Sequence, residues 1–194
     1  MLADTAAELR RGDRRRVLVA SAGREVGSMI PALALARVLA QEARVIVVDL
    51  ALADPKLGAA SVDPGGPGLA DLVRGTASFG QIITRDRSSR VHLIPAGRVR
   101  AEAAAILNSE RLRMGIEALT QAYDHVVIDA GAVPEMQIER MAQLASTAVL
   151  VTVALPDEVA AAAKDRLVAG GISDVIVLAG PIMQSRSDIQ PAAA

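Results

Sequence analysis

Short apolar runs alternate with longer, mostly helix-forming stretches between residues 17 and 179. The apolar runs are rich in Val and Ile and are short, so they predict strands at 17–21, 44–49, 91–95, 125–129, 147–155 and 174–179. The stretches between them predict helices at 28–41, 68–74, 101–122, 134–144 and 157–169. Because the strand runs are continuously apolar, both faces of the sheet must be covered. The pattern therefore predicts an α/β fold with a doubly wound, mostly parallel sheet between two helical layers.

A single domain accounts for this pattern. We place it at residues 17–180, between a polar N-terminal segment, 1–16, and a polar tail, 181–194, that we expect to be disordered. The length of 194 residues suits one domain. No apolar run reaches the roughly 18 residues of a membrane span, and segment 1–16 has no apolar signal core, so we expect a cytoplasmic protein.

The composition of the chain excludes several kinds of partner and of chemical site. Hydrophobic residues make up 52% of the chain but aromatic residues only 1%, so the core must be built from small and medium aliphatic side chains. The net charge of −1 gives no general attraction to nucleic acid, and no nucleic-acid partner is expected. The absence of Cys excludes disulfides, thiolate metal sites and a Cys nucleophile, and two His residues are too few for a His-built metal site.

The candidate site lies where the predicted strands end. In doubly wound folds, ligands bind at the carboxyl ends of the parallel strands. In this chain those ends hold Ser21, Asp49, Pro95 and Asp129. We therefore expect Ser21, Asp49 and Asp129 to lie close together at one edge of the sheet.

Six segments, in order and at matching spacing, carry a resemblance to a known family: VLVASAGREVGSMIPALALA, VVDLALADP, GLADLVRGTAS, LIPAG, AAAILNSERLRMGIEAL and YDHVVIDAGAV. They resemble the cytoplasmic domain of the bacterial tyrosine kinases of capsular and exopolysaccharide biosynthesis. The resemblance implies a P-loop NTPase-like fold of the MinD/ParA type. It also implies a phosphate loop over Gly23, Arg24, Gly27, Ser28 and Met29.

The phosphate loop departs from the family pattern. In such loops a Lys reaches the β and γ phosphates and a Ser/Thr hydroxyl holds Mg²⁺. Here Gly27 is kept, but the Lys position is Ser28 and the hydroxyl position is Met29. Glu25 adds an anion near the place where phosphate oxygens would lie. We interpret the loop as vestigial, with no cofactor expected; an active ATP- and Mg-binding loop, with Arg24 replacing the Lys, is the alternative.

Two aspartates keep positions that the family uses in catalysis and near Mg²⁺. They are Asp49 after the second strand and Asp129 after the fourth, and they are the metal ligands if Mg²⁺ binds at all. Either could instead simply cap the turn that follows its strand. The second Asp of the family's first pair is replaced by Ala51.

The resemblance together with the altered loop implies a degenerate, tyrosine kinase-like domain that regulates or supports polysaccharide biosynthesis and chain-length control. The expected partner is a membrane chain-length protein, that is, a polysaccharide co-polymerase, or an active kinase subunit; a second copy of the chain is a further candidate. Such a partner would hold the protein peripherally at the inner membrane. Two alternatives stay open: an active tyrosine kinase or ATPase of the same family, and a relative of pilus-assembly or partitioning ATPases. The spacing of Glu8, Arg11 and Arg14 also matches the family's Glu-x-x-Arg-x-x-Arg assembly motif, which we interpret as chance because Gly12 and Asp13 interrupt the helix.

Overall fold

A computed structural model describes residues 1–12, 14–99 and 103–180. Seven strands form one sheet in the order β3-β4-β2-β5-β1-β6-β7. The strands are β1 Arg16–Ser21, β2 Val45–Asp49, β3 Thr84–Arg85, β4 His92–Ile94, β5 His125–Ala132, β6 Thr147–Val151 and β7 Asp174–Leu178. All neighbouring pairs are parallel except β3 with β4. The predicted mostly parallel α/β sheet is therefore confirmed.

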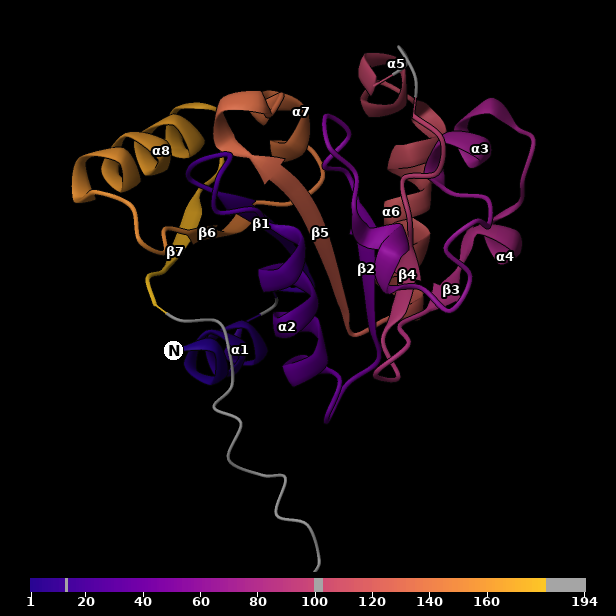
Figure 1. Ribbon diagram of the computed structural model, residues 1–194, viewed down its shortest axis with the longest axis horizontal. Helices are drawn as coiled ribbons and strands as arrows, with labels where there is room; N and C mark the ends of the chain where they lie inside the picture. The colour runs from indigo at the N-terminus through magenta and orange to yellow at the C-terminus, as the bar shows by residue number, and fades with distance from the viewer. Residues whose placement is uncertain (13, 100–102, 181–194) are drawn as a thin grey trace, which may run out of the picture.

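Helices cover both faces of this sheet (Figure 1). They are α1 Leu2–Arg11, α2 Met29–Leu39, α3 Leu69–Arg74, α4 Phe79–Ile82, α5 Ala103–Leu107, α6 Glu110–Ala122, α7 Ile138–Ala142 and α8 Asp157–Ala169, with 3-10 turns η1 Leu57–Ala60 and η2 Val133–Glu135. The side chains of successive residues in the central strands point alternately into two apolar cores. One core, which includes Leu18 and Ile128, packs under α3 to α8, and the other, which includes Val19 and Val127, packs under α1 and α2.

Helix α1 occupies most of the segment that the sequence analysis described only as polar. Ala6 and Leu9 have no exposed surface, and they join the core that α2 also covers. Asp4 and Arg11 are exposed on the other side of the helix, which ends at Arg11, whereas the polar residue Thr5 is buried. The segment 1–16 therefore contributes an apolar face to the fold, which its overall polarity conceals. The predicted disordered tail, 181–194, lies outside the described residues.

Two helix predictions are wrong in extent. The single helix predicted at 101–122 is two helices, α5 and α6, because Ser109 has an extended backbone and its hydroxyl accepts the N–H of Arg111 as an N-cap. The helix predicted at 134–144 is the turn η2 followed by α7. The strand predicted at 147–155 ends at Val151. Strand β3 and helix α4 were not predicted, since both are too short to show a period.

Candidate functional site

A pair of buried carboxylates lies at the carboxyl edge of the sheet. Asp49 and Asp129 are partners in the parallel register of β2 and β5, and neither has any exposed surface. Ser21 ends β1, which is the next strand beyond β5. The sequence-based expectation that Ser21, Asp49 and Asp129 share one edge is confirmed.

Asp49 anchors the loop that follows its own strand. One carboxylate oxygen accepts the N–H of Ala51 at 3.2 Å, and the other accepts the N–H of Leu57 at 3.1 Å. Both oxygens therefore already have backbone donors, as the turn-capping interpretation of this residue requires.

Ser28 is turned toward Asp129. Its hydroxyl donates to the Oδ1 atom of Asp129, and the N–H of Gly131 donates to the same oxygen at 3.3 Å. Ser28 is also the N-cap residue of α2, yet its side chain makes no capping hydrogen bond because the hydroxyl serves Asp129. Within the described part of the chain, Asp129 Oδ2 and the Ser21 hydroxyl are buried without a hydrogen-bond partner.

The pair is electrostatically unfavourable. Burial, and then the neighbouring charge of Asp129, raises the pKa of Asp49 to about 7, although the backbone N–H donors act against this. Burial also raises the pKa of Asp129, against the hydrogen bonds from Ser28 and Gly131. Removal of a carboxylate from water disfavours its charged form, and a second carboxylate beside it adds to that effect. At neutral pH the two groups together resist carrying two full charges.

The loop between β1 and α2 keeps one feature of a phosphate loop and lacks the others. Gly27 has a φ of 68°, a left-handed conformation that favours glycine. Met29 packs against the apolar core under α2. Arg24 forms an ion pair with Glu135 of η2, with 2.6 Å between Nε and Oε1. The Glu25 carboxylate folds back over Gly23, where a Cβ atom would lie 2.7 Å from one of its oxygens.

These residues fit Mg²⁺ poorly. Mg²⁺ takes oxygen ligands in near-octahedral geometry. Both Asp49 oxygens are occupied by backbone donors, Ser28 occupies Asp129 Oδ1, and Met29 brings no oxygen at all. No group of three or more His, Cys, Asp or Glu side chains that could hold a metal ion occurs among the residues described. Among the carboxylates that the structure describes, Asp129 Oδ2 is the one buried oxygen without a donor.

Comparison with known proteins supports the predicted resemblance in part of the chain. Over 106 residues, 54% of the chain, it is 29% identical to the tyrosine-protein kinase Ptk of Acinetobacter johnsonii. The match spans only 14% of that kinase's length. No family model matches the chain.

Solved structures extend the similarity over nearly the whole chain. The kinase domain of Escherichia coli tyrosine kinase ETK superimposes with a TM-score of 0.82 and 17% identity, over 95% of this chain and 74% of that one. The VpsO kinase domain gives a TM-score of 0.78 and 22% identity, over 93% and 95%. The septum site-determining protein MinD of Pyrococcus horikoshii, solved with Mg-ADP, gives 0.61 and 22%, over 84% and 68%. The chain resembles bacterial tyrosine kinase domains. Its P-loop NTPase-like fold is of the MinD type.

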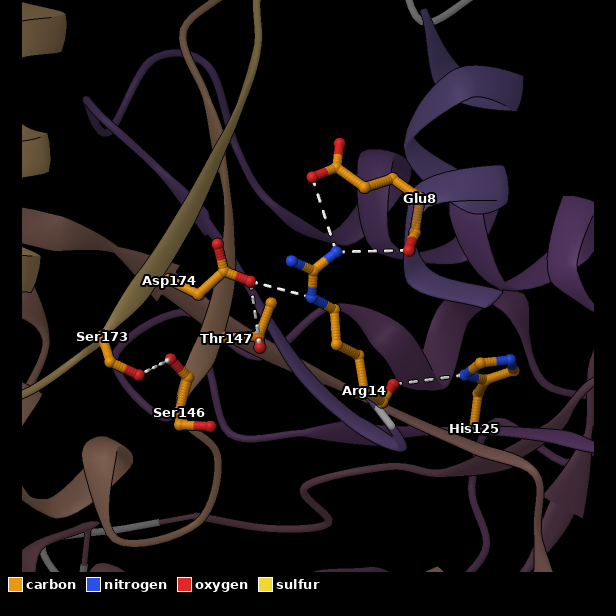
Figure 2. A network of polar contacts seen from close by, with 7 residues as sticks. All are labelled: Glu8, Arg14, His125, Ser146, Thr147, Ser173 and Asp174. Atoms are coloured by element: carbon orange, nitrogen blue, oxygen red, sulfur yellow. Dashed lines mark hydrogen bonds and ion pairs between the residues drawn. The ribbon is translucent and has the colours of Figure 1, made fainter. Parts of the chain in front are cut away.

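Two of the three residues that match the kinase assembly motif, Glu8 and Arg14, form contacts within this chain. Arg14 Nε lies 2.9 Å from a carboxylate oxygen of Asp174 on β7, and Arg14 NH1 lies 3.4 Å from the Glu8 carboxylate (Figure 2). The carbonyl of Arg14 also lies 3.4 Å from Nδ1 of His125. Arg11, the middle residue of the motif, is exposed. Arg14 therefore joins α1 to the edge strand β7.

The two aspartates and the loop could be located from the sequence, but the side-chain contacts between them could not. Nothing in a sequence pattern shows that Ser28, at the kinase Lys position, donates to Asp129. Glu135 was also missed, because its pairing with Arg24 depends on how η2 follows β5. Strand β5 carries an extra residue between the partners of Val19 and Ala20, and this bulge brings the Gly131 N–H to Asp129.

Proposed function

We propose that this domain is a nucleotide-independent regulator or scaffold in exopolysaccharide or capsular polysaccharide biosynthesis, acting in the control of chain length. It works by docking on a membrane chain-length protein or on an active kinase subunit. That partner holds it peripherally at the cytoplasmic side of the inner membrane. The chain spans a small part of its curated relative, so activities of that whole kinase are not transferred to it.

One observation supports this proposal above the others. The side chain at the kinase Lys position is a hydroxyl already bonded to Asp129, and the side chain at the metal-anchoring position is Met29, which is partly buried against the apolar core under α2. A cation and a metal ligand are thus both replaced. In phosphoryl transfer the protein contributes mainly positioning and charge neutralisation, so these two losses remove most of what catalysis requires.

The magnitude of the loss is large. Hydrogen bonds to charged groups contribute about 1.5–3 kcal/mol each. Loss of the Lys contact and the metal ligand together costs roughly 3–6 kcal/mol. A phosphate-loop protein with micromolar affinity, about −8 kcal/mol, would then bind Mg-ATP with a Kd of roughly 0.2–30 mM, a range centred on millimolar values.

The alternative of an active kinase or ATPase would need Arg24 to serve in place of the Lys. Arg24 is instead paired with Glu135, and its side chain is 71% exposed. An Arg at the surface of the loop is not held in an orientation that would bring its guanidinium to a phosphate. The alternative of a partitioning-type ATPase accounts less well for the GLADLV and LIPAG segments, which match the kinases.

The proposal is tested by co-purification from the native host. The tagged full chain should recover a membrane chain-length protein or a kinase subunit from detergent-solubilised membranes. Recovery should be equal with Mg-ATP present and with EDTA added, because the docked state does not depend on nucleotide. Recovery of no such protein, or recovery only with Mg-ATP, would contradict the proposal.

A further inference from the structure

The turn between β3 and β4 carries three arginines that no acidic side chain of the described residues neutralises. We call Arg85, Arg87 and Arg90 the arginine turn. All three residues are exposed. The only acidic residue within the turn is Asp86, which is buried and engaged by Arg37 through two hydrogen bonds of 2.8 Å. The turn thus presents the charge of three guanidinium groups.

The turn is held in a fixed shape. The Asp86 N–H donates to the Val91 carbonyl at 2.9 Å and closes it, and the Ser89 hydroxyl donates to the Asp86 carboxylate. Arg87 donates its Nε–H to the Ser61 carbonyl at 2.7 Å, and Arg90 donates its Nε–H to the Ala40 carbonyl. These bonds use one donor of each guanidinium and cancel none of its charge. The remaining donors are left for an anionic ligand.

The three side chains spread apart and do not converge on a pocket. Arg87 is directed to the segment after η1, and Arg90 to the end of α2. Arg85 pairs across the ladder with His92, and burial, followed by the charge of Arg85, lowers the pKa of that imidazole. Such an arrangement suits an extended anionic surface better than one bound anion.

An exposed apolar side chain adjoins the turn. Val62 is 59% exposed, and its N–H donates to the Arg85 carbonyl at 2.9 Å. Cations with an apolar side chain among them are typical of surfaces that rest on anionic lipid. Two acidic residues, Asp124 and Asp63, bear on the net charge of this surface. Asp124 is paired with Arg44, and Asp63 is the exposed neighbour of Val62.

We infer that the arginine turn and Val62 form a contact surface for anionic phospholipid headgroups. The turn leads into β4, so it lies at the edge where the parallel strands begin, opposite the edge with Asp49 and Asp129. A membrane bound there leaves the altered nucleotide edge facing away from the lipid. The contact is independent of the proposed scaffold function, since it needs neither a protein partner nor nucleotide.

Vesicle flotation of the full chain tests the inference. We expect binding to vesicles of phosphatidylcholine with phosphatidylglycerol, no binding to phosphatidylcholine alone, and loss of binding as salt is raised. Each basic residue near an anionic surface adds about fivefold to binding. The triple change Arg85→Gln, Arg87→Gln and Arg90→Gln should therefore lower binding on the order of 100-fold.

Matched variants make the result specific. Arg140→Gln, Lys164→Gln and Arg166→Gln change the net charge equally on exposed positions of α7 and α8, and should leave binding unchanged. Changing the three turn arginines to Lys keeps the charge and should keep the binding. If the triple Gln protein fails to fold, Arg85→Gln alone should lower binding about fivefold.

Equal binding to both kinds of vesicle would overturn the inference. So would an equal loss in the α7–α8 control protein, because the effect would then be one of net charge alone. Loss of binding in the Lys protein would also overturn it, and would assign the turn to an arginine-specific partner such as a phosphorylated peptide.

Discussion

Ser28 is the residue at which the loop differs most clearly in chemistry from the kinase phosphate loops that it resembles. A Lys at its position would project a cation out of the loop, whereas the Ser hydroxyl is short and bonds inward to Asp129. The two buried carboxylates lie beside each other and accept hydrogen bonds from backbone N–H groups and from this hydroxyl. Among the described residues, no cationic side chain pairs with either of them. A pair of this kind must reduce stability as it ionises, and that effect can be measured.

Asp129→Asn should stabilise the protein most at alkaline pH. Folded-state pKa values raised above the usual value mean that the folded chain binds more protons than the unfolded chain between about pH 4 and 7. Stability from this pair is therefore present at low pH and is lost as pH rises through about 7. Asn keeps the acceptor for Ser28 and removes the charge, so we expect a gain of about 1 kcal/mol or more at pH ~8.

Urea unfolding at several pH values measures this effect. The lowered pKa values of His92 and His125 act in the opposite direction at acidic pH, but they are common to both proteins and cancel in the comparison. The gain should shrink as the pH falls below about 7, because Asp49 then becomes protonated and no longer repels the Asp129 carboxylate. A gain that does not change with pH would show that the carboxylates do not repel one another.

Two junctions between elements that lie far apart in the sequence each include one contact that a substitution can test. Helix α1 packs on α2 through its apolar face, and only Arg14 links it to β7 by ion pairing in the contacts described. On the other face, α4 meets α6 where Phe79 lies over Gly115. Each junction can be tested by one substitution.

Arg14→Gln should loosen α1. The change removes the ion pairs with Glu8 and Asp174, all three side chains being 29% to 43% exposed, so we expect a modest loss of about 1 kcal/mol. Hydrogen exchange should rise in α1 and β7 and stay unchanged in β2. Arg11→Gln, at an exposed position of the same helix, is the control. Equal effects of the two substitutions would mean that the Arg14 contacts contribute nothing specific.

Gly115→Ala should destabilise the protein although Ala is the better helix former. A Cβ atom at residue 115 would lie 2.3 Å from the ring of Phe79. Overpacking of this kind costs about 1–3 kcal/mol, more than the roughly 1 kcal/mol that helix propensity returns. Phe79→Leu in the same chain should recover part of the loss, as a double-mutant cycle by thermal unfolding would show. A stabilised Gly115→Ala protein would contradict the packing.

The sequence predicted long periodic elements well and short or composite ones poorly. The apolar strands β1, β2 and β5 and the Ala- and Leu-rich α2 follow from local pattern, because burial on all sides leaves a continuous apolar run. The break at Ser109 was missed because helix propensity is high on both sides of it. The buried face of α1 was missed because only a few of its residues, such as Ala6 and Leu9, are apolar and inward.

At the site, the positions of the residues could be predicted from the sequence, but their hydrogen bonds and ion pairs could not. Asp49 and Asp129 could be placed because the ends of parallel strands share one edge. The Ser28 and Glu135 contacts could not be predicted. The first depends on the direction of side chains that are 101 positions apart, and the second depends on a 3-10 turn. The site therefore differs from the family pattern in its side-chain contacts as well as in its residue types.

The molecule as a whole combines a kinase-like fold with a loop in which Ser28 and Met29 stand at the two positions where a phosphate loop carries Lys and Ser/Thr. Helices cover both faces of the sheet, and the parallel strands bring the loop and the two aspartates to one edge of it (Figure 1). The central claim is that the domain nevertheless works without nucleotide. If so, the fold is retained for docking, and two substitutions at the start of α2 should move it toward binding.

Titration calorimetry with Mg-ATP, on the natural chain and on the double variant Ser28→Lys, Met29→Thr, tests this claim most directly. We expect the natural chain to bind more weakly than about 1 mM or not at all. The double variant should bind measurably, because the helix start, Gly27 and both aspartates are in place. Glu25 should keep its affinity below that of an ordinary phosphate loop. Micromolar binding of Mg-ATP by the natural chain, abolished by Arg24→Ala, would contradict the account and establish an active nucleotide site.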